Sequence, residues 1–258
     1  PLVEHLESLL SGTGQALDLK TFKLVDQLTG RSLGVRADMT PQVARIDAHL
    51  LNRQGVVRLS YCGPVLHARA DNLLASRELL QFGAEIYGHA AFEADLEVID
   101  LALDALRAAG VAQLVLDVGD ARCVAHALGT GLAQNQLEEL MAALAAKDAA
   151  AVQSLARTPQ EGACWAGLLS LHGGTEVLPK ARTFFADAPA VLAALADMQR
   201  MVAHVEREHP QVRVSIDLAD TSGYAYYSGL RFAAYAPQTQ SALCRGGRYD
   251  EVGAVFGR

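Results

Sequence analysis

Residues 61–88 read YCGPVLHARADNLLASRELLQFGAEIYG. Residues 55–67 and 77–88 are rich in aromatic and apolar side chains, and a polar stretch separates them. This pattern predicts two long strands joined by a loop. Together they would form a large antiparallel pair.

The segments before this pair predict a helix, a hairpin and a second helix. Residues 2–10 place four leucines at helical spacing. Residues 21–36 hold two short strands around the turn LTGR. Residues 40–53 open with Thr40 as N-cap and Pro41 at the first helical position.

The segments after the pair alternate between helices and strands, which predicts an α+β fold. Residues 133–208 are almost entirely helical in pattern and rich in Ala, Leu and Glu. The chain therefore divides into a first core part (1–132), a helical insertion (133–208) and a second core part (209–258). The other expected elements are helices at 93–109 and 121–128, strands at 113–118, 211–217, 229–236 and 241–245, and a GGRYD turn at 246–250 in which Arg248 and Asp250 pair.

Composition excludes several classes of protein. Of the 258 residues 51% are hydrophobic and 20% are charged, which supports a sizeable core and argues against disorder. The net charge is −7 and no basic run is present, which disfavours a nucleic-acid partner. The four cysteines form no CxxC pair, so we expect free thiols. No segment predicts a membrane span.

Two groups of polar residues are candidates for ligand binding. Gln81 and Glu85 are four apart, so a regular strand presents both on one face, with Gly83 leaving space between them. They predict either a pocket for a small polar ligand or an ordinary wet sheet face. Asp38 and Thr40 precede a helix and could cap it, bind an ammonium group, or divide these tasks.

Other polar residues favour structural roles. Tyr224, Tyr226 and Tyr227 lie in SGYAYYSG (222–229), where packing is the commoner role for tyrosine and ligand binding the alternative. No nucleophile is evident for His67. His204 and His209 are five apart, which places them on different helix faces and argues against a metal site.

Three motifs together resemble the catalytic core of class II histidyl-tRNA synthetases. VRADMT (35–40) is similar to that family's LRPEGT. Residues 61–88 are similar to its YxGPxFRxE…QxGxExxG, and SGYAYYSGLRFAAY with GGRYD is similar to its RGLDYYxxTVFE and GGRYD. The resemblance implies a class II antiparallel sheet flanked by helices. It also implies that the chain begins within the first helix and stops at Arg258 before the core ends.

The departures from that family concern activation of the amino acid. An ATP-binding arginine aligns with His67, the following glutamate with Arg69, and an arginine peculiar to histidyl enzymes with Ser222. Each lost cationic donor is worth about 3–4 kcal/mol in a transition state. Amino-acid activation is therefore expected to be lost.

The chain is very similar to the regulatory subunits of ATP phosphoribosyltransferase, which are paralogues of histidyl-tRNA synthetases. Typical phrases are TFKLVDQLTGRSLGVRADMTPQVARIDAH (21–49), QFGAEIYGH (81–89) and GGRYDEVGAVFGR (246–258). This resemblance implies a cytoplasmic protein of histidine biosynthesis without catalytic residues, cofactor or metal. It implies a class II-type dimer within a hetero-octamer, the short-form catalytic subunit as partner, and feedback by L-histidine. The alternatives are a divergent synthetase and another histidine-binding paralogue. The histidine-binding residues implied are Asp38, Thr40, Gln81, Glu85, Tyr226 and Tyr227.

Overall fold

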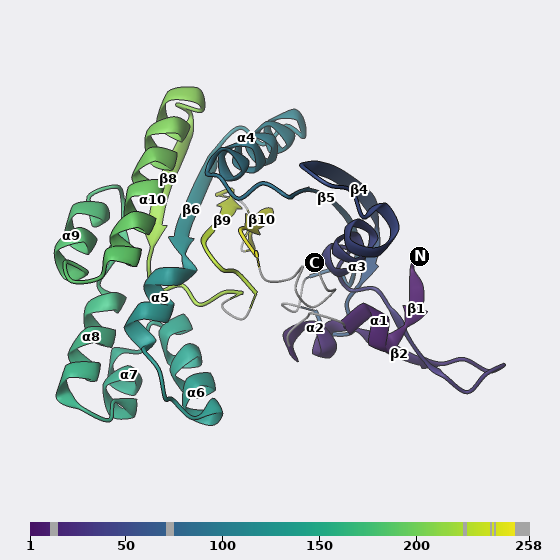
Figure 1. Cartoon of the computed structure of the whole chain (residues 1–258), viewed down its shortest axis with the longest axis horizontal. Coiled ribbons are helices and arrows are strands. Elements are labelled where there is room, and N and C mark those ends of the chain that lie inside the picture. Colours follow the sequence, from purple (N-terminus) through teal and green to yellow (C-terminus); the bar gives the residue numbers. More distant parts are fainter. Residues whose placement is uncertain (11–14, 71–74, 224–225, 238, 240, 251–258) are drawn as a thin grey trace. The chain divides into compact units, whose positions relative to one another are not determined.

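The structure is a computed structural model that describes residues 1–10, 15–70, 75–223, 226–237, 239 and 241–250. The chain forms two compact units. The first consists of Pro1–Ala90 together with Asp250, and the second of Ala91–Tyr249. Figure 1 labels the helices and strands of both units.

A three-stranded antiparallel sheet opens the first unit, in the order β1-β3-β2. The hairpin predicted at 21–36 is confirmed, but the single helix predicted at 2–10 is wrong. Val3, Glu4 and His5 pair with β3, so the helix begins only at Leu6. The strands and helices of this part are β1 (Val3–His5), α1 (Leu6–Leu10), α2 (Gln15–Lys20), β2 (Phe22–Val25) and β3 (Ser32–Val35).

The helix predicted at 40–53 is present as α3 (Thr40–Arg45), continued by the π-helix η1 (Ile46–Leu51). The N-cap of α3 is Met39 rather than Thr40, and the Met39 side chain makes no capping hydrogen bond. Asp38 instead accepts a hydrogen bond from the backbone N–H of Thr40 at 3.0 Å. One of the unpaired N–H groups at the start of the helix is thereby satisfied.

The predicted antiparallel pair is β4 (Val57–Leu66) and β5 (Glu78–Tyr87), which form a two-stranded sheet paired over ten residues each. Leu59 lies opposite Glu85, Tyr61 opposite Gly83, and Gly63 opposite Gln81. Residues directly opposite one another in a ladder project to the same face.

The second unit is built on a five-stranded sheet of order β10-β9-β6-β8-β7. All neighbours are antiparallel except β6 and β8, which are parallel. Parallel strands need a long crossover, and the helices between β6 and β8 supply it. The strands are β6 (Leu114–Asp120), β7 (His172–Gly173), β8 (Val212–Asp217), β9 (Leu230–Tyr235) and β10 (Cys244–Gly247).

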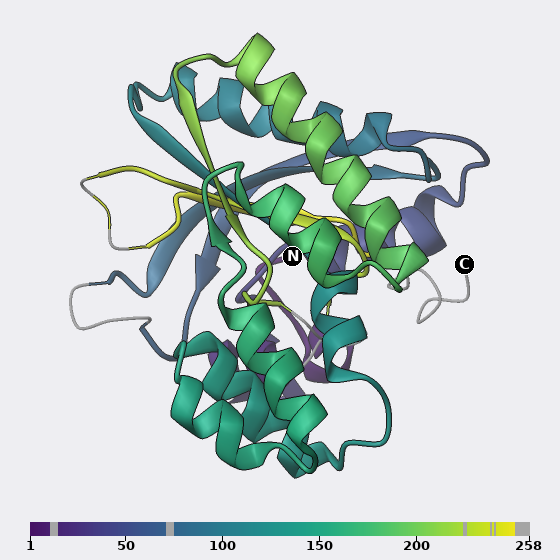
Figure 2. The same cartoon turned by 90° about the vertical axis from the view of Figure 1, so that its left-hand side faces the viewer.

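Seven helices are described in the second unit. Several begin at a side-chain cap: Asp120, Asp148 and Thr158 each accept from a backbone N–H in the first turn. Figure 2 shows the helices that follow β6, from α5 to α10, in teal to green. The division of the chain into a core and an insertion stays a prediction. The helices are α4 (Glu93–Ala108), α5 (Ala121–Leu128), α6 (Gln134–Ala145), α7 (Ala149–Leu155), α8 (Pro159–Leu169), α9 (Val177–Phe184) and α10 (Pro189–Glu208).

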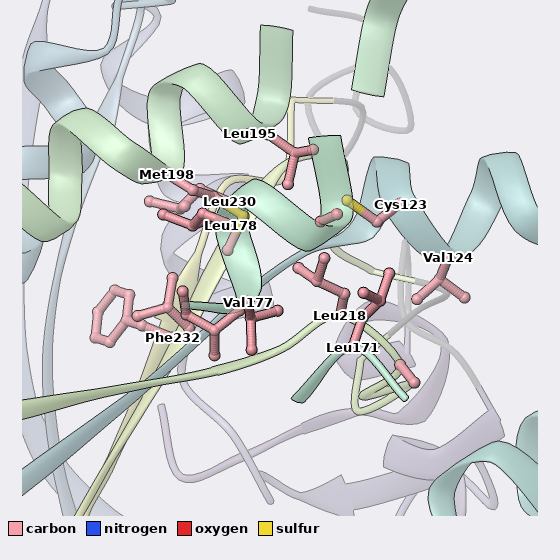
Figure 3. Close-up of a cluster of buried hydrophobic side chains, with 14 of the residues drawn as sticks. Cys123, Val124, Leu171, Val177, Leu178, Leu195, Met198, Leu218, Leu230 and Phe232 are labelled. Carbon is pink, nitrogen blue, oxygen red and sulfur yellow. The ribbon is translucent and has the colours of Figure 1, made fainter. Parts of the chain in front are cut away.

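One face of the five-stranded sheet forms the main hydrophobic core with these helices. Leu195 and Met198 of α10 are fully buried, and so is Leu116 of β6. Figure 3 shows Leu195 and Met198 near Leu230, among side chains from several elements that are distant in sequence. Burial of each such side chain stabilises the fold by about 1.5–3 kcal/mol.

The GGRYD segment does not form the expected turn at its start. Gly246 and Gly247 are the last residues of β10 and pair with Phe232 and Arg231 of β9. The guanidinium of Arg248 forms an ion pair with Asp95 at 2.8 Å. This ion pair therefore connects the residue after β10 to helix α4.

No helix in the described ranges combines the length and apolarity that crossing a bilayer requires.

Candidate functional site

The first unit brings four of the predicted site residues to one end of α3 and one face of β5. Gln81 and Glu85 share a face because both lie at alternate positions of β5. Asp38 and Thr40 belong to the turn that leads from β3 into α3. A network of side-chain hydrogen bonds links the turn to the strand.

Gln81 carries this link. Its Nε2 donates to Asp38 Oδ1 at 2.9 Å, and its Oε1 accepts from the backbone N–H of Met39 at 3.0 Å. The same Asp38 oxygen also accepts from the Thr40 N–H. The amide therefore fixes both the carboxylate and the backbone of the turn.

The space expected above Gly83 is filled by Tyr61. A Cβ atom built on Gly83 would lie 2.4 Å from the Tyr61 hydroxyl oxygen, far inside van der Waals contact. The hydroxyl is 3.1 Å from Thr40 Oγ1. Glycine is therefore needed so that the Tyr61 ring can cross β5 between Gln81 and Glu85.

Tyr61 also stays protonated in this setting. Burial raises the pKa of its hydroxyl strongly, and the negative charges of Glu85 and Asp38 raise it further. A protonated hydroxyl can both donate and accept a hydrogen bond. Tyr61 is thus a polar group of the site that was not predicted from the sequence. Its position opposite Gly83 in the β4–β5 register is the signal that identifies it.

Glu85 is almost completely buried, with 6% of its surface exposed. The hydroxyl of Tyr87 donates to its carboxylate. Tyr87 follows two residues later on the same face, and the sequence reasoning missed it as well. Asp38 and Glu85 together supply two carboxylates on one side of the β4–β5 pair.

His67 and Arg69 stand at positions where the synthetase family has activating groups. His67 Nε2 is 3.1 Å from the carbonyl oxygen of Ala37. The backbone of His67 also forms an isolated antiparallel β-bridge with Thr21. Arg69 is exposed. His67 therefore has the structural role that was expected for a lone histidine at a strand end.

The two other predicted site residues, Tyr226 and Tyr227, lie in the second unit. Their rings meet edge to face with centroids 5.5 Å apart, and Tyr226 also contacts the ring of Tyr249 at 4.8 Å. Both backbone N–H groups donate to the carbonyl oxygen of Gly223. Tyr224 lies outside the described residues.

His204 and His209 converge on one carboxylate, although their spacing predicted different faces of a helix. His209 is the C-cap of α10 and has non-helical backbone angles, so helical spacing does not govern its direction. Nε2 of His204 and Nε2 of His209 lie 2.8 and 3.0 Å from Asp100 Oδ1. Within the described ranges, no group of three or more metal-binding side chains has a geometry that could hold an ion.

Comparison with known proteins places these features in a family. The histidyl-tRNA synthetase family model matches residues 1–258. The ATP phosphoribosyltransferase regulatory subunit of Variovorax paradoxus is 57% identical over 100% of this chain and 68% of its own length. That of Acidovorax sp. is also 57% identical, over 100% of this chain and 67% of its own length.

Solved structures agree with this placement. A protein from Bacillus halodurans, described as an ATP phosphoribosyltransferase regulatory subunit/histidyl-tRNA synthetase, has a TM-score of 0.85 at 30% identity. It is matched over 100% of this chain and 68% of that chain. The ATP phosphoribosyl transferase (HisG:HisZ) complex from Thermotoga maritima shares the fold, with a TM-score of 0.71 at 18% identity, over 96% of this chain and 84% of that chain. The class II synthetase-like α+β fold expected from the motifs is thereby confirmed.

Proposed function

Because the chain belongs to the histidyl-tRNA synthetase family, and among its members to the ATP phosphoribosyltransferase regulatory subunits, we propose that it regulates that enzyme without catalysing a reaction itself. It binds the short-form catalytic subunit in the cytoplasm, supports its activity, and takes part in inhibition by L-histidine. The assembly is a hetero-octamer in which the regulatory chains pair as class II-type dimers.

The observation that carries this proposal is the intact polar network around Gln81. Asp38 is held by two hydrogen bonds, from Gln81 Nε2 and from the Thr40 N–H, so its carboxylate is fixed before any ligand arrives. A fixed carboxylate binds an ammonium group without first losing conformational freedom. We assign the α-ammonium group of histidine to Asp38, Thr40 and Gln81.

Glu85 suits the imidazole. Its side chain is buried. It lies on the same face of β5 as Gln81, with Gly83 between the two residues. A carboxylate suits an imidazole N–H as an acceptor, because hydrogen bonds to charged groups are the stronger ones. For Tyr226 and Tyr227 the histidine-binding role is carried by the resemblance alone.

The absence of catalysis is supported by the residues at the activating positions. His67 is engaged with Ala37, and Ser222 donates its backbone N–H to Asp220 Oδ1 at 2.8 Å. Neither places a guanidinium where the synthetase family has one. With about 3–4 kcal/mol lost for each donor, adenylate formation would fall by more than four orders of magnitude.

Reconstitution tests the proposal. The chain is mixed with a short-form catalytic subunit. Complex formation is followed by gel filtration, and phosphoribosyl transfer by initial rates. We expect co-elution, a higher rate, and a rate that falls when histidine is added. Separate elution with an unchanged rate would refute the regulatory role.

A divergent synthetase is the competing function, because relatives of the same fold include histidyl-tRNA synthetases. It predicts histidine-dependent exchange of pyrophosphate into ATP. The regulatory role predicts none above background.

A further inference from the structure

Glu85, to which we assign the imidazole, lies beside tyrosine hydroxyls from both strands of the β4–β5 pair. The hydroxyl of Tyr87 donates a hydrogen bond to the Glu85 carboxylate. Burial, and then the charge of Glu85, raise the pKa of the nearby Tyr61 hydroxyl. Because only 6% of Glu85 is exposed, protein groups replace most of the water around its carboxylate.

The two tyrosines are placed differently. Tyr61 crosses β5 above Gly83, and its hydroxyl also lies 3.1 Å from Thr40 Oγ1. Tyr87 follows Glu85 by two positions on the same face of one strand. Its hydroxyl therefore reaches the carboxylate from the end of β5 that lies away from Gln81.

The backbone that carries Tyr87 is closely packed. Tyr87 is the last residue of β5 and lies opposite Val57, which is 8% exposed. Gly88 follows with a φ of 75°, a conformation that favours glycine, and a Cβ atom there would collide with the carbonyl oxygen of Gly55. The end of β5 is thereby held against the residue that precedes β4 by two positions, and the Tyr87 ring starts from a fixed point.

The hydrogen bond from Tyr87 orders the Glu85 side chain before a ligand arrives. A glutamate side chain has several rotatable bonds, and immobilising such a side chain on binding reduces affinity. A carboxylate accepts at two oxygens with about four lone-pair positions, so one phenolic donor does not exhaust it. The carboxylate therefore keeps capacity for an N–H donor while its direction is set.

We propose that Tyr87 is a positioning residue that gives the pocket its preference for a ring bearing an N–H donor. The inference rests on the proposed binding of histidine in the first unit. Tyr87 acts through Glu85, because its hydroxyl aims the carboxylate at the imidazole. A site built around such an acceptor rejects a ring of similar size that lacks the donor. If Tyr87 served only to pack, phenylalanine would preserve this preference, since it keeps the ring.

Calorimetry with two ligands tests this role. L-histidine and 3-(2-thienyl)-L-alanine, whose five-membered ring has no N–H, are titrated into the parent chain and into Tyr87→Phe. We expect Tyr87→Phe to bind histidine about 5- to 10-fold more weakly, because hydrogen bonds to charged groups are among the stronger ones. Its affinity for thienylalanine should stay within about twofold of the parent. Unchanged histidine affinity, or an equal loss for both ligands, would overturn the proposal.

A double-mutant cycle shows whether Tyr87 acts through Glu85. In the Glu85→Gln background, Tyr87→Phe should change histidine affinity by less than about twofold, because the carboxylate that Tyr87 positions is gone. A loss as large as in the parent chain would overturn the proposal. Tyr235→Phe removes a hydroxyl from the second unit and should bind both ligands as the parent does.

The same titrations separate this inference from the function on which it rests. A parent chain that binds no histidine would refute the proposed pocket itself. A parent chain that binds histidine, together with a Tyr87→Phe variant of equal affinity, would refute only the positioning role.

Discussion

The amide of Gln81 and the carboxylate of Asp38 are joined by a hydrogen bond of 2.9 Å, with Gln81 Nε2 as donor. The two residues are 43 positions apart in sequence, one on strand β5 and one in the turn before α3. The bond therefore couples the shape of the turn to the strand. We propose that histidine recognition in the first unit depends on this coupling.

Replacing Gln81 by Leu is expected to weaken histidine binding by 10- to 100-fold. The change removes the donor to Asp38 and the acceptor for Met39 N–H, and hydrogen bonds to charged groups contribute about 1.5–3 kcal/mol. Isothermal titration calorimetry measures the effect. Gln54→Leu, at an exposed loop position, is the matched control and should bind as the parent does. Parent-like affinity in Gln81→Leu would contradict the proposed role of the network.

A methyl group at position 83 is expected to be more damaging than loss of the Tyr61 hydroxyl. Gly83→Ala forces Tyr61 from its place, and overpacking of this kind costs about 1–3 kcal/mol. Tyr61→Phe keeps the ring and loses the hydroxyl, which bonds to Thr40 and interacts with Glu85, at a cost of about 1 kcal/mol. Urea denaturation ranks the two variants, with Tyr235→Phe of the second unit as a control for a tyrosine hydroxyl. The reverse ranking would show that Tyr61 does not pack over Gly83.

Much of this arrangement could be predicted from sequence. The aromatic and apolar composition of residues 55–67 and 77–88 located β4 and β5, and the four-residue spacing of Gln81 and Glu85 placed them on one face. Tyr61 was missed because its role depends on pairing register, which relates it to Gly83 only after the strands are aligned. The strand β1 was missed because three residues are too few for periodicity to distinguish from a helix.

The convergence of His204 and His209 on Asp100 could not be predicted for a related reason. Ideal helical spacing applies to His204. It does not apply to His209, because this C-cap residue has non-helical backbone angles. The partner comes from α4, more than a hundred residues earlier. Only the packing of α4 against α10 brings the three together.

Asp100→Asn is expected to destabilise the second unit by about 1–3 kcal/mol. It replaces an acceptor shared by two imidazoles with an amide, and His209 is almost completely buried beside it. The midpoint of urea denaturation reports the loss. Asp104→Asn, one turn further along α4, breaks only an exposed pair with Arg107 and should shift stability by less than about 0.5 kcal/mol. Equal midpoints for the two variants would show that the Asp100 cluster does not stabilise the fold.

Asp117→Asn is expected to stabilise the chain above pH 6. Because burial raises the pKa of Asp117 to about 6 from 3.8, the folded state holds this proton more tightly than the unfolded state does. The stability that the proton provides is present below about pH 4 and is lost as the pH rises through 6. The amide avoids this loss, which we put at about 1–2 kcal/mol after allowing for partial solvent screening.

Thermal melts at pH 4.5 and pH 8 measure the pH dependence of this effect. The melting temperatures of Asp117→Asn and the parent should differ more at pH 8 than at pH 4.5. Asp187→Asn should track the parent at both values. A constant difference between Asp117→Asn and the parent would mean that Asp117 titrates normally.

The central claim is that this chain has kept a histidine-binding pocket for regulation, and calorimetry of histidine with Glu85→Gln tests it most directly. Gln is close to Glu in size but removes the buried negative charge. The account predicts saturable 1:1 binding of L-histidine to the parent chain and at least tenfold weaker binding to Glu85→Gln, with both chains equally folded by circular dichroism. Undiminished affinity in Glu85→Gln would contradict it.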